Sequence, residues 1–219
     1  MRINNLLNLN MDLFSNIINW KEELYPILEK YKSKKHPLNY NSLYELVIMV
    51  VLSAQDSDEN INNIAPNFFF KFPKMENLAQ SNLDEIIPHI NAVKYHENKA
   101  EWILNIAKTI KKEENIPLTM KSLTAIKGIG RKSANVIMKE ANIPLEGIMT
   151  DLHVIRVAPR IGIINPTQDG LKAEKQLMAV LPKEIWNEIG MSISFLGREI
   201  CRPKPKCEEC PINSACKYP

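Results

Sequence analysis

The most informative segment of the sequence is Lys127-Gly128-Ile129-Gly130-Arg131-Lys132-Ser133-Ala134-Asn135, which lies between two segments with helical apolar spacing. The spacing predicts two helices over 123–141, broken at Gly128 and Gly130. Glycines two positions apart permit a positive φ angle and let the backbone approach a ligand closely. The second helix then presents its N-terminal N–H groups and the positive end of its dipole. Together these features predict a phosphate-binding site.

The charges around this hairpin favour phosphate as the ligand. Lys127, Arg131 and Lys132 flank the glycines, and Ile129 lies between them. Residues 119–219 carry 15 basic and 10 acidic side chains, whereas residues 1–118 carry 13 and 15. A basic C-terminal half suits contact with phosphates, although a solvated surface gives the same count. A helix–hairpin–helix binds the DNA backbone without reading its sequence. The structural alternative is a tight turn between two helices.

Lys132 has a second candidate role, because it lies in the first turn of the predicted helix. The helix dipole there disfavours the ammonium form of the side chain. A lysine whose pKa is lowered can act as a nucleophile and form a Schiff base. The alternative is an ordinary surface lysine.

Asp151 is the candidate partner of Lys132. It precedes a predicted helix that ends near Gly162, so it is well placed as an N-cap. The functional alternative is a carboxylate brought opposite Lys132, where it helps to deprotonate the amine or stabilises a cationic sugar transition state. His153 is either a helix-surface residue or a phosphate contact.

All four cysteines lie near the C-terminal end, in the pattern Cys201-x5-Cys207-x2-Cys210-x5-Cys216. Four thiols this close together favour a metal centre over a disulfide framework. Structural zinc sites usually contain two C-x2-C pairs, and only one occurs here. An iron–sulfur cluster is wider and accepts ligands spread over longer loops, so the spacing favours a cluster over zinc. The loop is either redox-active, structural, or a rigid basic loop that rests against a phosphate backbone.

Composition places the chain among ordinary globular proteins. Of its 219 residues, 45% are apolar and 24% are charged. The sequence contains no apolar run of about 18 residues, which predicts no transmembrane helix. The N-terminal residues show no secretory signal, so we expect a cytoplasmic protein, nucleoid-associated if the source is bacterial.

The apolar pattern predicts an all-α fold, because strand-type alternation is scarce. Ser42 and Glu45 form a predicted capping box, Asp58 is a predicted N-cap, and Pro26 disturbs the first helix. Besides the hairpin pair, helices are predicted over 16–32, 43–54, from 58 onward, 75–79, 83–90, 97–113, 151–162, 170–180 and 184–200.

The order of the hairpin, Lys132, Asp151 and the cysteine loop resembles the endonuclease III family of helix–hairpin–helix DNA glycosylases. Three further segments are similar to segments of that family: Leu52-Ser53-Ala54-Gln55, His96-Glu97-Asn98-Lys99-Ala100 and Gly197-Arg198-Glu199-Ile200-Cys201. The resemblance covers roughly residues 20–217.

This resemblance implies a two-lobed fold around a DNA cleft and a [4Fe-4S] cluster on the four cysteines. It implies one lobe from 16–40 and 143–200, a second from 41–142, and a cluster loop over 201–217. The Asn-rich segment over 1–15 is expected to be flexible. It also implies a monomer that binds double-stranded DNA containing damaged bases or abasic sites, and no membrane. The catalytic residues implied are Lys132 as the nucleophile at the sugar C1′ and Asp151 as its carboxylate partner.

Two more residues gain a role from the resemblance. Gln55 matches the residue that fills the space left by a flipped base. Tyr95 falls where the family inserts an apolar side chain between bases, so an aromatic wedge is expected there. A half-buried surface aromatic is the alternative for Tyr95. The DNA-contacting set is then Gln55, Tyr95, Lys127, Gly128, Ile129, Gly130, Arg131 and His153.

The sequence also departs from the family pattern. Five residues instead of six separate Cys201 from Cys207. Four further departures lie on the expected DNA-facing side: Lys94 replaces a glycine, Lys127 a proline, Leu152 a threonine or small residue, and Asp56-Ser57-Asp58 replaces Ala-Thr-Asp.

Three functions are therefore weighed. The first is a bifunctional glycosylase and AP lyase that removes oxidised pyrimidines and nicks the strand 3′ to the abasic site by β-elimination. The second is a monofunctional glycosylase for mismatched or damaged bases, which needs no amine at Lys132. The third is a non-catalytic DNA-binding protein, which needs no carboxylate at Asp151. The presence of both residues favours the first.

Overall fold

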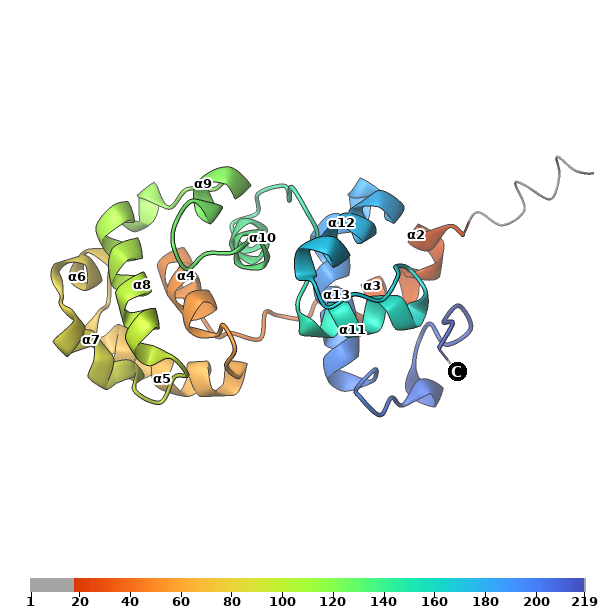
Figure 1. The fold of residues 1–219 in the computed structure, drawn as a ribbon, viewed down its shortest axis with the longest axis horizontal. Coiled ribbons are helices and arrows are strands. Elements are labelled where there is room, and N and C mark those ends of the chain that lie inside the picture. The colour runs from red at the N-terminus through yellow and green to blue at the C-terminus, as the bar shows by residue number, and fades with distance from the viewer. Residues whose placement is uncertain (1–17, 219) are drawn as a thin grey trace, which may run out of the picture. The chain divides into compact units, whose positions relative to one another are not determined.

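The computed structural model describes residues 18–218, and every regular element in that range is helical (Figure 1). The chain divides into two compact units, one formed by Ser33–Asp151 and the other by Leu152–Pro219 with the N-terminal segment up to Lys32. The all-α prediction is confirmed. The segment over 1–15, expected to be flexible, lies outside the described residues. None of the helices in the described range is long and apolar enough to cross a membrane.

The Ser33–Asp151 unit contains seven α-helices. In chain order they are α4 (Leu43–Leu52), α5 (Asp58–Lys71), α6 (Met75–Gln80), α7 (Leu83–Ile90), α8 (His96–Ile110), α9 (Met120–Thr124) and α10 (Arg131–Glu140), with a 3₁₀ turn at Glu113–Asn115. α4 packs against α5, α8 and α10 (Figure 1). Every residue from Leu46 to Leu52 is buried, as expected of a helix that is apolar on all sides.

Side chains at the starts of α4 and α5 explain where these helices begin. Ser42 accepts a hydrogen bond from Glu45 N, which confirms half of the predicted capping box. The Glu45 carboxylate accepts from Asn41 N at 2.7 Å rather than from Ser42 N. The prediction of Asp58 as N-cap is wrong, because Ser57 caps α5 through Asn60 N and Asp58 is the first helical residue. Asp58 still suits the positive end of the helix dipole.

The other unit contains α2 (Trp20–Glu23), α3 (Tyr25–Tyr31), α11 (Leu152–Ile161), α12 (Gly170–Val180) and α13 (Trp186–Glu199), with 3₁₀ turns at Lys183–Ile185 and Cys207–Glu209. The helix predicted over 16–32 is divided at Leu24, and Pro26 lies in the first turn of α3, where its missing N–H is harmless. α11 packs closely on α13, since a Cβ atom at Gly197 would lie only 2.9 Å from the His153 Cβ atom.

The unit boundaries differ from those expected at 40/41 and 142/143, because residues 33–40 and 143–151 belong with the Ser33–Asp151 unit. Contacts in the first of these segments explain the difference. The Tyr40 hydroxyl donates a hydrogen bond to Glu140 on α10. Asn39 N donates to Asn62 Oδ1 on α5 at 2.8 Å.

Candidate functional site

The glycine hairpin connects α9 to α10 as predicted. Gly128 has a φ angle of 97°, and a Cβ atom there would lie 3.1 Å from the Trp102 Cβ atom on α8. Glycine is therefore needed at this position both for the turn and for the close approach to α8. Ile129 is buried and its N–H donates to Ile126 O at 3.1 Å, which anchors the hairpin from inside.

α10 begins at Arg131 without a side-chain cap, because its N-cap residue is Gly130. Because glycine has no side chain, Gly130 leaves the positive end of this helix uncovered. A Cβ atom added at Gly130 would meet no atom within 4 Å. Lys127 and Lys132 are exposed, and Arg131 is partly exposed. The start of α10 therefore combines open space, a positive dipole end and three cationic side chains, which is the arrangement expected for a phosphate.

Asp151 directly precedes α11, as the sequence predicted, and its side chain is half-buried. Lys132 and Asp151 belong to the same compact unit, whereas His153 lies on α11 in the other. The His153 ring is held by Arg156, whose Nη2 atom lies 3.1 Å from His153 Nδ1. The same guanidinium donates to Gly197 O at 2.9 Å.

Gln55 and Tyr95 share an uncommon backbone conformation. Each has a φ angle of 58°, in the left-handed region, and each is exposed, Tyr95 to 61%. Residues other than glycine adopt this backbone region rarely, and mostly at functional sites or at turns that neighbouring groups hold in place. An exposed aromatic ring on such a turn is consistent with the predicted wedge and differs from the half-buried alternative.

Sequence reasoning assigned no role to Lys99, which is almost completely buried on α8. Its Nζ atom donates to Leu52 O and to Ala54 O, both at 2.7 Å, and so caps the end of α4 just before Gln55. Burial lowers the pKa of Lys99 and the Lys94 charge adds to this, whereas the Asp56 carboxylate opposes it. The sequence signal that could have pointed to Lys99 is its place in the family-like segment His96-Glu97-Asn98-Lys99-Ala100.

The four cysteines lie in one loop, are all half-buried and form no disulfide. Burial raises the pKa of Cys210, the Ile212 N–H opposes this, and the other three thiols raise it further. Arg160 secures the loop by donating to Arg202 O at 2.7 Å. In the described range, no three His, Cys, Asp or Glu side chains converge closely enough to hold a metal ion. The donor set fits a four-cysteine cluster in number and type, and a cube spreads its ligands more widely than a single ion does.

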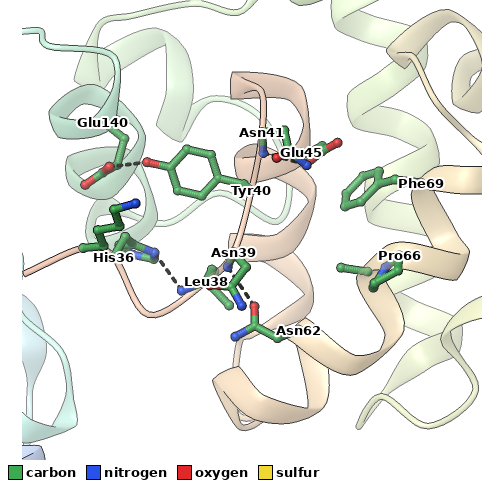
Figure 2. Close-up of a pocket in the computed structure, with 12 residues that line it drawn as sticks. His36, Leu38, Asn39, Tyr40, Asn41, Glu45, Asn62, Pro66, Phe69 and Glu140 are labelled. Carbon is green, nitrogen blue, oxygen red and sulfur yellow. Dashed lines mark hydrogen bonds between the residues drawn. The ribbon is translucent and has the colours of Figure 1, made fainter.

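A hollow that the sequence did not predict opens beside α10. Figure 2 shows this cavity of about 660 Å³ between the 35–41 segment, α5 and Glu140. Burial lowers the pKa of His36 in its wall to about 4; the Glu140 charge opposes this shift, and the Lys132 charge adds to it.

Comparison with known proteins defines the class of this fold. Residues 48–183 match the family model described as HhH-GPD superfamily base excision DNA repair protein. Endonuclease III of Synechocystis sp. is 32% identical over 89% of this chain and 90% of its own length. Endonuclease III of Bacillus subtilis is 34% identical over 82% of this chain and 83% of its own length. A solved structure of a trapped Endonuclease III–DNA covalent intermediate matches with a TM-score of 0.81 and 29% identity, covering 90% of this chain and 94% of that one.

These matches place the fold in the class of helix–hairpin–helix base excision repair glycosylases. The chain belongs to the endonuclease III family within that superfamily. The family and fold predicted from the sequence are thereby confirmed, and the chain is a DNA glycosylase of base excision repair.

Proposed function

We propose that this chain is a bifunctional DNA glycosylase and AP lyase that removes oxidised pyrimidines from duplex DNA. The observation that carries the proposal is the position of Lys132 in the first turn of α10. This helix follows the glycine hairpin directly and has no side-chain cap at its start. The similarity to a trapped covalent Endonuclease III–DNA intermediate supports a lysine that bonds to DNA. We further propose that the protein acts as a monomer in the cytoplasm, on the nucleoid if the source is bacterial.

Binding begins at the hairpin. Backbone N–H groups at the start of α10, with Lys127 and Arg131, hold a phosphate of the damaged strand. Tyr95 stacks between bases and Gln55 fills the space of the nucleotide that is rotated outward. Gln55 suits that place, because an amide both donates and accepts hydrogen bonds and so pairs with an orphaned base. His153 contributes a further phosphate contact.

The chemistry follows at the sugar. The Lys132 amine, deprotonated with help from Asp151, attacks C1′, and the bond from C1′ to the base nitrogen breaks, so that the base leaves with the bonding electron pair. Opening of the sugar ring gives a Schiff base between Lys132 Nζ and C1′. Loss of a proton from C2′ then expels the 3′ phosphate by β-elimination, which nicks the strand, and water releases the enzyme. The Asp151 carboxylate stabilises the cationic sugar in the first step.

Trapping with borohydride on a duplex with one abasic site tests this proposal. Borohydride reduces a Schiff base to a stable amine, so the wild-type chain is expected to form a covalent adduct with the DNA. A chain that binds this duplex without forming any adduct would favour the monofunctional or the non-catalytic alternative.

We expect binding to duplex DNA to weaken steeply with added salt, because phosphate contacts release counterions. Changing both Lys127 and Arg131 to alanine should reduce the log–log slope of affinity against salt by about two. Fluorescence anisotropy over a salt series measures this. Lys74→Ala, at the exposed start of α6, is the matched control and should leave the slope unchanged. An unaltered slope in the double variant would remove the hairpin from the DNA contact.

We also propose that Cys201, Cys207, Cys210 and Cys216 hold a [4Fe-4S] cluster. When bound, the cluster would cross-link the loop and keep its basic side chains in place beside α11. Cys210→Ser should lower the iron content of the purified protein and its melting temperature together, since a bound metal centre stabilises the folded state. Ser214→Ala in the same loop is the control. Full iron content with the serine variant would exclude Cys210 as a ligand.

A further inference from the structure

Two turns of the Ser33–Asp151 unit carry the proposed DNA-inserting residues. The turn between α4 and α5 carries Gln55, and the turn between α7 and α8 carries Tyr95. Both residues have the left-handed φ angle of 58°. Backbone of this kind persists only where neighbouring groups hold it.

One carboxylate bridges the two turns. Asp56 Oδ2 accepts a hydrogen bond from Lys94 N at 2.8 Å, directly before Tyr95. Asp56 Oδ1 accepts hydrogen bonds from two groups at the start of α5, Ser57 N at 2.8 Å and Asn60 Nδ2 at 3.0 Å. Asn60 Nδ2 also donates to Ala92 O at 3.1 Å, in the Tyr95 turn. Hydrogen bonds of Asp56 and Asn60 therefore join the Gln55 turn to Lys94 and Ala92, which lie just before Tyr95.

The charge state of Asp56 suits this bridge. Burial alone would raise its pKa, but the hydrogen bonds from Lys94 N–H, Asn60 and Ser57 N–H, with the Lys99 charge, outweigh burial and hold the pKa below its ordinary value. The carboxylate is therefore ionised at neutral pH, and hydrogen bonds to an ionised acceptor are about twice as strong as neutral ones.

We propose that Asp56 is a positioning residue that fixes the Tyr95 turn against the Gln55 turn, so that both side chains enter DNA together. The endonuclease III pattern has an alanine at the position of Asp56. The bridge therefore depends on a residue at which this chain departs from that pattern. Lys99 secures the end of α4 through its side chain, and its backbone N–H donates to Tyr95 O at 3.0 Å at the start of α8. This inference rests on the proposed roles of Gln55 and Tyr95.

The test compares nicking at an abasic site in duplex DNA with nicking at the same site in a single strand. Insertion is needed only in the duplex. For Asp56→Ala we expect the single-turnover rate on the duplex to fall by about tenfold or more, since a charge-assisted hydrogen bond is lost. The rate on the single strand should stay within about twofold. Asp56→Asn keeps one carbonyl oxygen, so its duplex rate should lie in between.

Asp169→Ala is the matched control. Asp169 also accepts two backbone N–H bonds, from Leu171 and Lys172, but it caps α12 in the other unit. Its duplex-to-single-strand ratio should equal that of the wild type. An unchanged duplex rate in both Asp56 variants would overturn the proposal, and so would an equal fall on both substrates, because that pattern reports a general loss of structure.

Fluorescence of 2-aminopurine placed opposite the abasic site separates this inference from the proposed function. The signal reports unstacking without requiring catalysis, and it should be weaker with Asp56→Ala than with the wild type. A wild-type chain that nicks neither substrate would contradict the proposed lyase activity. A fluorescence change that is equal in wild type and variant would contradict the positioning role alone.

Discussion

Replacement of Lys132 by glutamine should abolish strand nicking at an abasic site while DNA binding persists. An amide nitrogen does not attack C1′ and forms no imine, so we expect the single-turnover rate to fall by at least about a thousandfold. Affinity for the duplex should drop less than about tenfold, because the hairpin N–H groups and the neighbouring cations remain. Gel separation of nicked strands and fluorescence anisotropy measure the two quantities.

The position of Lys132 makes this variant informative. The side chain is exposed in the first turn of α10 and is not part of the buried core, so its replacement leaves the core residues unchanged. Lys139→Gln, near the other end of the same helix, is the matched control and should nick DNA normally. Normal nicking by Lys132→Gln would exclude the Schiff base at this residue. Loss of both binding and nicking would instead reduce Lys132 to a phosphate contact.

Local signals predicted the helices that have strong caps. The helix predicted over 83–90 has these bounds in α7, where Asn82 and Glu85 form a complete capping box. The helix over 170–180 matches α12, which Asp169 caps. The helix predicted over 97–113 ends early, at Ile110, because Lys111 adopts a φ angle of 70°. The polar residues around Lys111 in the sequence do not predict this angle. Bounds set by caps were predictable, and bounds set by an unusual backbone angle were not.

The site shows the same division. The turn at the hairpin and the place of Lys132 in the first turn of α10 were predictable, because both follow from a short motif of residue types at fixed spacing. The bridge from Asp56 to Lys94 joins residues 38 apart, and Lys99 reaches a carbonyl 47 residues away. Such contacts depend on how α8 packs against α4, which no local pattern contains. The sequence marked Asp56 only as a departure from the family pattern, and the structure supplies its partner.

Asp151→Asn should keep the fold and lose turnover, and this separates the two interpretations of Asp151. Asparagine is as good an N-cap as aspartate, so a capping role at α11 predicts an unchanged melting temperature and an unchanged rate. A catalytic carboxylate predicts the same melting temperature but a rate at least about a hundredfold lower, because the amide neither accepts the lysine proton nor stabilises a cationic sugar.

Two further variants complete this comparison. Asp151→Ala removes the carboxylate altogether. A capping role predicts a loss of about 1 kcal/mol in the free energy of unfolding, and a catalytic role predicts a lower rate as well. Asp169→Asn, at the N-cap of α12, should change neither quantity. Thermal unfolding and single-turnover nicking of the same preparations measure both. Wild-type turnover by Asp151→Asn would leave Asp151 as a helix cap and exclude it as the group that deprotonates Lys132.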